Sequence, residues 1–535
     1  MKKIYYLLLL STSFLSCQKN INDVTQPHPL NVSANSAVIQ STTTAIADTI
    51  PPSNATDVKT YGAKGDGVTD DSGAIQNAIN RANVIVFSKG TYMINKTLIL
   101  RSGVSIYGIN GATIQAGPSM TGDLLISGRY FYLNSVSGSS LINLKFQPSI
   151  KNFSLGAWAN AVIYIANSPN NIFKYNIINF KQAYAASGVE GFWVSGTGSI
   201  NNQITYNTLN TVGIEYAEAG ASYNTFLFNT IVNAHSDALS AHGNSTVYCT
   251  KNRVLYNRIT NAGHMGIEDW GNVDGTQVRG NVINGTGKSP SEGTDGIGIS
   301  LVGVNAVAVL NTISDAKLMY MEIGGNHNCR VDSNIIYDTA GLITGILVNF
   351  RSATPANAKS SGSSIGYNTI FNCLEGISVE GDYTPLAALT GNKINDPKYI
   401  GINVNSNSAF TVGLNGNVIT YTKPNVQARN GIVVYSTKLS GAQITNVTGN
   451  TITYNTSANS GSAKEIALMI GVNNINYTGN YVYGNKIKAG GVPISAISSN
   501  GNNFSGITVL NNTFSGATVD LLHLIFKTNT GNTIL

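Results

Sequence analysis

The sequence of 535 residues has little charge, proline or cysteine. Charged residues make up only 11% of it, and its net charge of +6 includes Lys2 and Lys3 at the extreme N-terminus. The other basic residues are scattered, which excludes the clustered basic face of a nucleic-acid-binding protein. With 42% hydrophobic residues and only 13 prolines, the chain is neither disordered nor collagen-like.

The sequence also has too few cysteines to stabilise the fold through a set of disulfide bonds. Beyond Cys17 only Cys249, Cys329 and Cys373 remain, an odd number at wide spacing. This pattern predicts neither a disulfide framework nor a zinc site, and we expect buried small apolar side chains. No segment after the leader is long and apolar enough to span a bilayer.

The leader MKKIYYLLLLSTSFLSC has a positive start, a short apolar run and a small residue before Cys17, as export signals do. It resembles a bacterial lipoprotein signal, in which the cysteine is lipidated and becomes the first mature residue. Phe14 departs from the aliphatic residue usual at that place, and an ordinary cleaved signal is the alternative. Both interpretations predict export. We expect an outer-membrane or cell-surface lipoprotein anchored in the membrane through Cys17, with the periplasmic face as an alternative.

Three regions follow from this pattern. Residues 1–17 are the expected signal peptide, and residues 18–55, rich in Ser, Thr, Asn and Pro without periodicity, are a flexible tether. Residues 56–535 are the expected folded domain. Such a length in one domain requires an architecture that grows by repetition.

A recurring asparagine supplies that repetition. It returns every 22 to 35 residues, each time followed by a step that ends in an apolar residue. The copies are Asn176, Asn207, Asn229, Asn257, Asn281, Asn311, Asn334, Asn368, Asn392, Asn417, Asn450, Asn485 and Asn512. A period of this kind indicates one coil of a solenoid with insertions in the loops.

The segments between the asparagines alternate with period two and are rich in β-branched residues, which predicts strands. No helical stripe and no leucine skeleton appear in the repeats. We therefore predict an all-β fold, a single-stranded right-handed parallel β-helix. The repeated asparagine would bond to its copies above and below as a stacked amide ladder.

The segment before the repeats predicts how the core is closed. Asp70 or Asp71 can cap a short helix whose apolar face is Ala74, Ile75, Ala78 and Ile79, laid over the first coil. The motif YGAKGDGVTDDSGAIQNAI followed by VIVFSKGTYMI resembles the start of the pectate-lyase-like β-helix superfamily, which includes polygalacturonases, tailspike hydrolases and mannuronan epimerases. The resemblance implies this β-helix with its capping helix and a polysaccharide partner. It names no reaction, because the motif is an end cap.

Aligning coils on their Gly-Ile step predicts an outer strand face. The aligned hexapeptides begin at Asp237, Met265, Asp295, Met319, Thr344 and Glu375. Their third place is always apolar and should face the core, so the second, fourth and sixth places should face outward. The second place is small nearly throughout and would leave a shallow groove, in which Tyr320 could be a stacking wall.

Carboxylates gather at the fourth place, where Glu215, Glu268 and Glu322 occupy alternate coils. Coils lie ~4.8 Å apart, so Glu268 and Glu322 should be ~9.6 Å apart at their backbones. Inverting glycosidases hold their acid and base ~6.5–9.5 Å apart. Asp237 lies one coil from Glu268, closer to the ~5–5.5 Å of a retaining pair.

Several further residues are candidates. Asp269 stands in a core-facing column, so it is either buried with a raised pKa, as a general acid requires, or turned outward by a bulge. His264 could do acid–base work or bond locally. His242, Trp270 and Arg351 could bind sugar by hydrogen bonding, by stacking and by pairing with a substrate carboxylate or sulfate, or they could be ordinary surface residues.

Three functions remain open. We favour a glycoside hydrolase with paired carboxylates at Glu268, Glu322 and Asp237, which requires no cofactor. The second is a polysaccharide lyase led by His264, Tyr320 and Arg351, with Glu215, Asp237 and Glu268 holding calcium. The third is a non-catalytic glycan-binding surface protein. The polygalacturonase residue set and the epimerase Asp-Pro-His motif are both missing, which argues against pectin as the substrate.

Overall fold

The computed structural model describes residues 49–120, 129–147, 160–179, 189–244, 246–290, 295–324, 328–349, 362–381, 388–406, 411–423, 428–436, 444–454, 465–472, 474–484, 494–499, 504–515, 517–519 and 524–534. The chain separates into two compact units, Met1–Ile50 and Pro51–Leu535. The leader, Cys17 and most of the expected tether lie outside the described residues. Their boundaries stay predictions.

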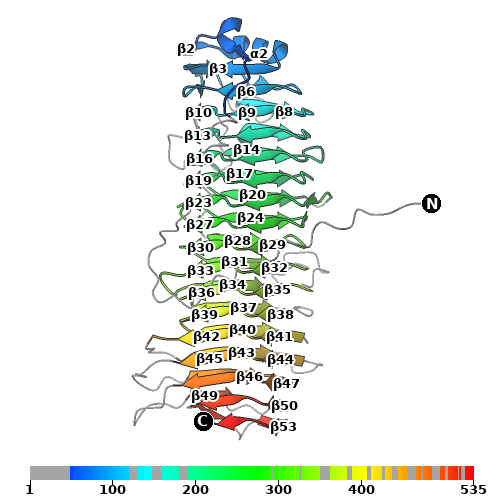
Figure 1. The fold of residues 1–535 in the computed structure, drawn as a ribbon, viewed down its shortest axis with the longest axis vertical. Coiled ribbons are helices and arrows are strands. Elements are labelled where there is room, and N and C mark those ends of the chain that lie inside the picture. The colour runs from blue at the N-terminus through cyan, green and yellow to red at the C-terminus, as the bar shows by residue number, and fades with distance from the viewer. Residues whose placement is uncertain are drawn as a thin grey trace, which may run out of the picture. The chain divides into compact units, whose positions relative to one another are not determined.

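Residues 51–535 coil into a parallel β-helix (Figure 1). Its strands stack into three long sheets, here called A, B and C, of eighteen, eighteen and sixteen strands. Sheet A runs from β1 (Thr56–Asp57) to β53 (Leu524–Thr530), sheet B from β2 (Asp66–Asp70) to β54 (Thr533–Ile534), and sheet C from β5 (Leu98–Ile99) to β52 (Ala517–Val519). Most coils give one strand to each sheet, and each strand pairs in parallel with the equivalent strand of the next coil. The predicted all-β, single-stranded right-handed parallel β-helix is confirmed.

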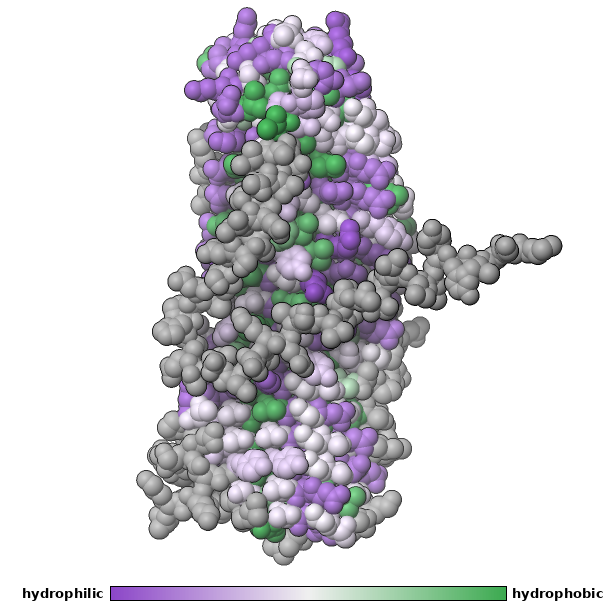
Figure 2. All heavy atoms as spheres, in the orientation of Figure 1, coloured by the Kyte–Doolittle hydropathy of each residue, from purple (hydrophilic) through white to green (hydrophobic). Residues whose placement is uncertain are grey.

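The strands that position the site belong to sheet C. They are β8 (Phe131–Asn134), β11 (Asn160–Ala166), β14 (Val189–Ser195), β17 (Ile214–Glu218), β20 (Leu239–Gly243), β24 (Ile267–Gly271), β28 (Ile297–Leu301), β31 (Met319–Gly324), β34 (Thr344–Asn349), β37 (Glu375–Gly381), β40 (Ile400–Ser406), β43 (Arg429–Ser436), β46 (Glu465–Gly471) and β49 (Ile494–Ser498). Inward side chains form one continuous core along the coil, because successive strands repeat the same alternation. On the face in Figure 2, hydrophilic and hydrophobic side chains mix among the described residues.

The asparagine ladder lies between sheets A and B, as the sequence predicted. In each coil the side-chain oxygen accepts bonds from the backbone and side-chain amides of the preceding copy; Asn229 donates both to Asn257 Oδ1, at 2.9 and 3.0 Å. Near the C-terminus the ladder residue is Asn480. The prediction of Asn485 at that place is wrong, and Asn485 itself lies outside the described residues. A second ladder, which was not predicted from the sequence, joins Asn171, Asn202, Asn224 and Asn252.

The residue before each ladder asparagine has a left-handed backbone conformation, which makes the turn between sheets A and B tight. Tyr206, Phe228 and Tyr256 have φ values of 57°, 54° and 52°, unusual for bulky side chains. Their rings pack on one another at 5.1 and 5.4 Å between centroids. Ring packing between coils therefore offsets the backbone strain of the turn.

The N-terminal end of the β-helix is closed by α2 (Ser72–Arg81). The N-cap residue is Asp71, whose side chain makes no capping bond to the helix, and Asp70 instead accepts a bond from the Ser72 amide at 3.0 Å. Ile75, Ala78 and Ile79 are buried against the first coil, whereas Ala74 is partly buried. The turn η2 (Val58–Tyr61) packs beside it, and Asp71 accepts from the Lys64 and Gly65 amides.

Cys249, Cys329 and Cys373 are buried, as predicted, and among the described residues none of them forms a disulfide. Among the described residues, no helix has the length and apolarity to cross a membrane.

Candidate active site

The outer face of sheet C carries a column of alternating glutamate and serine. Register joins Glu215, Ser240, Glu268, Ser300 and Glu322 on β17, β20, β24, β28 and β31. Ser240 donates to Glu215 at 2.9 Å, and Ser300 donates to Glu322 at the same distance. Glu268 and Glu322 thus share one face two coils apart, as the sequence predicted.

The residue between these two glutamates is Ser300, and the prediction of Gly298 at this place is wrong. The β28 segment contains two Gly-Ile steps in succession, and Ile299, from the second, pairs with Ile267. A Cβ on Gly298 would lie 2.5 Å from Ile313 Cγ2, so this position points into the tube.

The small second places do not form an outer groove. A Cβ on Gly266 would meet Ile283 of sheet B at 2.9 Å, and Ala238 is part of the core. Tyr320 takes the same inward place, is 1% exposed and packs in the core. The predictions of a shallow groove and of a Tyr320 stacking wall are wrong, because β20 and β24 begin only at the third place and the preceding residues still belong to the bend.

The first residues of the aligned hexapeptides face outward instead. Asp237 is one of these residues, and its side chain therefore lies at the site. Asp237 Oδ1 lies 2.7 Å from His264 Nδ1 and accepts a bond from the Met265 amide at 2.8 Å. Burial alone would raise the pKa of Asp237, but the hydrogen bond and charge of His264 lower it below its ordinary value. The same bond raises the pKa of His264. The hydrogen bond therefore favours the ionised form of both partners.

His242 lies at the centre of the site, between two glutamates. Its Nδ1 is 2.8 Å from Glu215 Oε2, and its Nε2 is 3.3 Å from Glu268 Oε2. Burial alone would lower the pKa of His242, but the charges and hydrogen bonds of Glu215 and Glu268 raise it to about 11. The imidazole is thus a fixed cation, a more central place than the sugar ligand the sequence suggested.

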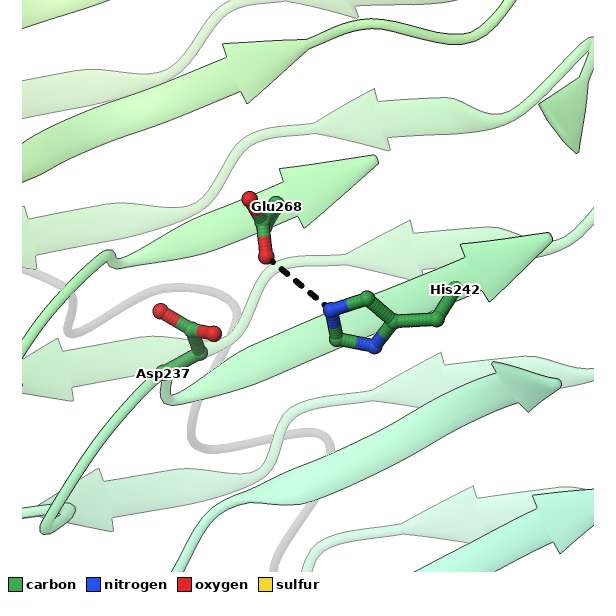
Figure 3. A group of neighbouring side chains, drawn as sticks. All are labelled: Asp237, His242 and Glu268. Carbon is green, nitrogen blue, oxygen red and sulfur yellow. Dashed lines mark ion pairs between the residues drawn. The ribbon is translucent and has the colours of Figure 1, made fainter. Parts of the chain in front are cut away.

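Asp237, His242 and Glu268 converge (Figure 3). One ligand atom from each lies within 4.8 Å of the other two. Burial raises the pKa of Glu268, although the hydrogen bond to His242 opposes this. Two neighbouring carboxyl groups therefore have pKa values displaced in opposite directions, Asp237 downward and Glu268 upward.

Glu190 of β14 belongs to the same cluster, and sequence reasoning missed it. It is 7% exposed and its Oε2 has no hydrogen-bond partner. Burial and the charges of Glu215 and Asp237 raise its pKa well above the ordinary value. Glu190 stands two residues before core-facing Phe192, as Asp237 stands before Leu239, so extending the coil alignment by two coils would have found it.

Asp269 lies inside the tube and is fully buried. A bulge at Tyr216 in β17 turns this ring inward, and its hydroxyl donates to Asp269 Oδ1 at 2.9 Å, beside a bond from Thr276 at 3.1 Å. Burial raises the pKa of Asp269 to about 7. Of the two alternatives that the sequence left open, burial with a raised pKa is the observed one, and the catalytic role of Asp269 stays a prediction.

The remaining candidates from the sequence are Trp270 and Arg351. Trp270 pairs with His242 in the outer row and is 48% exposed, so its ring is accessible and its stacking role stays a prediction. Arg351 lies outside the described residues. Toward the N-terminus the glutamate column continues as Trp193, Tyr164 and Tyr132, with the Arg129 guanidinium 3.6 Å from the centre of the Tyr164 ring.

Residues 55–268 match the protein family described as rhamnogalacturonase A/epimerase, pectate lyase-like. The segment is less than half of the chain but contains Glu190, Glu215, Asp237, His242, His264 and Glu268. No curated protein sequence matches the chain.

Solved structures that share the fold include PfbA, a surface adhesin of Streptococcus pneumoniae, at 17% identity over 70% of this chain and 93% of that one, with a TM-score of 0.43. The catalytic unit of a GH87 α-1,3-glucanase from Streptomyces thermodiastaticus has 14% identity, coverages of 75% and 68%, and a TM-score of 0.45. A tailspike protein of E. coli bacteriophage HK620, solved with a hexasaccharide, has 10% identity, coverages of 87% and 80%, and a TM-score of 0.47. Over residues 55–268 the chain thus matches the pectate-lyase-like family, and the resemblance to right-handed β-helix proteins that its opening motif indicated is confirmed.

Proposed function

We propose that the protein is a glycoside hydrolase that cleaves a polysaccharide at the outer face of sheet C. The observation that carries the proposal is the convergence of Asp237 and Glu268, with oxygens within 4.8 Å and pKa values displaced in opposite directions. Two carboxyl groups, one protonated and one ionised, are the acid and base set of glycosidases. The family match supports a polysaccharide as the substrate.

The two carboxyl groups divide the chemistry. Glu268, whose pKa burial raises, gives its proton to the glycosidic oxygen as the bond from that oxygen to the anomeric carbon breaks. Asp237 is the ionised partner, and its two hydrogen bonds with described residues end on Oδ1, which leaves Oδ2 to attack the anomeric carbon. Water, deprotonated by Glu268, then hydrolyses the glycosyl ester. The spacing favours this retaining course, which requires ~5–5.5 Å between the groups.

Glu322 takes a different role in this proposal. Two coils separate it from Glu268, and its carboxylate is held by Ser300. The inverting pair of Glu268 and Glu322 is therefore less favoured than the convergent pair with Asp237. Glu322 and Trp270 would instead bind the sugar units beside the cleaved bond.

His242 supports hydrolysis over the calcium-dependent lyase. Calcium takes six to eight oxygen ligands. Here both imidazole nitrogens face carboxylates, and the resulting cation occupies the place where a metal ion would neutralise Asp237 and Glu268. The residues do not fit a calcium site. His242 instead balances Glu215 and limits repulsion within the cluster.

The test is a glycan panel with wild type, Glu268→Gln, Asp237→Asn and the control Glu380→Gln, which changes a carboxylate on the same sheet several coils away. We expect new reducing ends, without the ultraviolet absorbance of an unsaturated uronate. Activity should fall about 10²–10⁴-fold in the first two variants and stay unchanged in the control.

Unsaturated products would replace the proposal with a lyase. Binding without any product would leave a glycan-binding surface protein. Equal activity in Glu268→Gln and wild type would remove Glu268 from the chemistry.

We also propose that the protein is exported and anchored through Cys17, on the strength of the leader sequence alone. Labelled palmitate should enter wild type and not Cys17→Ser, and the variant should leave the membrane fraction. Cleavage without labelling would favour the ordinary signal peptide.

A further inference from the structure

A groove lies at the corner between sheets C and A, apart from the carboxylate site. It has a volume of about 560 Å³. Its walls come from the same coils as the site, at the turn residues Tyr223, Lys251 and Asn305 and at the first residues of the sheet A strands β22 (Arg253–Leu255) and β26 (Gln277–Arg279). The groove therefore runs across successive coils, along the length of the β-helix.

Two cations line this groove. Arg253 donates to Thr225 Oγ1 from Nε at 3.2 Å and from Nη2 at 2.8 Å, which fixes the plane of an exposed guanidinium. Lys251 is exposed, and its Nζ lies 5.9 Å from the centre of the Tyr223 ring. Held in place in this way, a guanidinium and an ammonium form a preformed site for carboxylate or sulfate oxygens.

The single acid in the lining is already engaged. Asp274 Oδ1 accepts a bond from the Asn305 side chain at 2.7 Å, which ties two walls of the groove together. The floor beside it is Gly275, at φ 71°, and a Cβ there would contact the Lys251 side chain at 3.4 Å. The left-handed backbone, and not a lack of space, therefore favours glycine at this turn.

Tyr223 completes a lining suited to sugars. The ring is 48% exposed, and the side-chain amides of Asn201, Gln277 and Asn305 line the same groove on neighbouring coils. An exposed aromatic face with convergent amide groups is able to stack on a sugar ring and bond its hydroxyls.

We propose that this corner groove binds a saccharide unit that carries an anionic group, a carboxylate or a sulfate. The chemistry contrasts with that of the active site, where carboxylates predominate among the described residues. The groove acts as a separate docking point for an acidic glycan, and its function does not depend on the hydrolysis proposed above.

The experiment is affinity electrophoresis of the full chain in gels that contain polygalacturonate, dextran sulfate or neutral dextran. The test variant is Lys251→Glu with Arg253→Glu. The control is Arg258→Glu with Lys393→Glu, which makes the same charge change at exposed positions on sheet B. Melting curves establish that all variants fold.

We expect an acidic polymer to retard the wild-type protein. The dissociation constant of the complex with that polymer should rise about tenfold or more in the groove variant and stay at the wild-type value in the control variant. Retardation by polygalacturonate identifies a carboxylate ligand, and retardation by dextran sulfate alone identifies a sulfate. The proposal is overturned if neither acidic polymer retards the protein, if neutral dextran does so equally, or if the control variant loses as much. A failure here leaves the Glu268→Gln test untouched, because the two tests change different residues and measure different quantities.

Discussion

At the scale of single residues, the histidine partner determines what each carboxylate can do. Asp237 bonds to His264 and has a lowered pKa, whereas Glu268 has a raised pKa although it contacts His242. His242 also pairs with Glu215 through its other ring nitrogen, so the positive charge of its imidazole interacts with two carboxyl groups. A carboxylate with a histidine of its own stays ionised, and one that shares a histidine keeps its proton more readily.

The first residue-scale prediction concerns His264→Gln. Loss of the His264 charge removes the main influence that lowers the pKa of Asp237, while the burial that raises it remains. Because the hydrolase needs Asp237 ionised, the acidic limb of the kcat/KM profile should move to higher pH, with about tenfold less activity at its acidic end. Lys288→Gln, which changes an exposed cation paired with Asp315 in the same turn region, should leave the limb in place. An unshifted limb in His264→Gln would contradict the role given to the pair.

The second concerns Asp269→Asn and stability. The pKa of Asp269 is raised from 3.8 to about 7 in the folded protein, so the folded state holds a proton that the unfolded state releases near pH 4. The free energy of unfolding should therefore fall as pH rises from about 4 to about 7, by the order of a few kcal/mol. Asparagine cannot ionise and should remove this fall. Denaturant unfolding of both proteins at pH 5 and pH 8 measures the difference, and identical pH dependence would refute it.

Residue types in the sequence were sufficient to find most of the cluster. Glu268, Asp237, His264 and His242 all belong to it, because coil stacking brings similar places together. Their roles depended on orientation, which alternation predicts only inside a strand. Tyr320 lies near the start of its strand, where the backbone bends, and it was assigned to the wrong side of the sheet.

At the scale of elements, the asparagine ladder fixes one coil to the next. Asn257 Oδ1 accepts from the Asn229 backbone and side chain, while its own Nδ2 donates to Phe226 O at 3.0 Å and to Asn281 Oδ1 at 3.0 Å. Every polar atom of the buried amide is thereby used. The ladder replaces the water that an irregular turn would otherwise need.

Asn257→Ala should accordingly lower the free energy of unfolding by about 2–5 kcal/mol, since it removes the acceptor of the buried Asn229 backbone amide and one of the two acceptors of the Asn229 side chain. The control is Asn284→Ala, at an exposed amide in the next coil, with an expected change within about 0.5 kcal/mol. Denaturant unfolding of both variants is the measurement. Equal effects would mean that the ladder adds no more than a surface amide does.

The elements themselves were largely predictable, because the asparagine period and the alternation of apolar residues repeat in every coil. The register between neighbouring strands of sheet C was predictable only where the sequence of a coil contains a single Gly-Ile step. The sequence DGIGIS offers two steps, and a shift by two residues keeps the same alternation, so only packing against Ile267 and Met321 selects Ile299. The bulge at Tyr216 left no signal in a single sequence.

At the scale of the β-helix as a whole, one end is closed by a helix. Ile75 and Ile79 of α2 are fully buried over the first coil, and they cover core residues and strand edges that would otherwise meet water or another chain.

Ile79→Asp should uncover this end. We expect a loss of about 3 kcal/mol or more in stability and the appearance of soluble aggregates, because a buried charge loosens the helix from the core. Asn77→Asp adds the same charge on the exposed side of the helix and should leave the protein monodisperse. Size-exclusion chromatography with light scattering distinguishes the two. A monodisperse Ile79→Asp protein would show that the cap does not protect the edge.

The parallel register has a consequence for how the molecule is made. Each strand bonds only to the equivalent strands one coil earlier and one coil later, so no early segment waits for a late one. A nascent chain that emerges from the ribosome N-terminus first brings α2 and the first coil out together. Every following coil then finds a finished template, and growth in one direction replaces the search for distant partners.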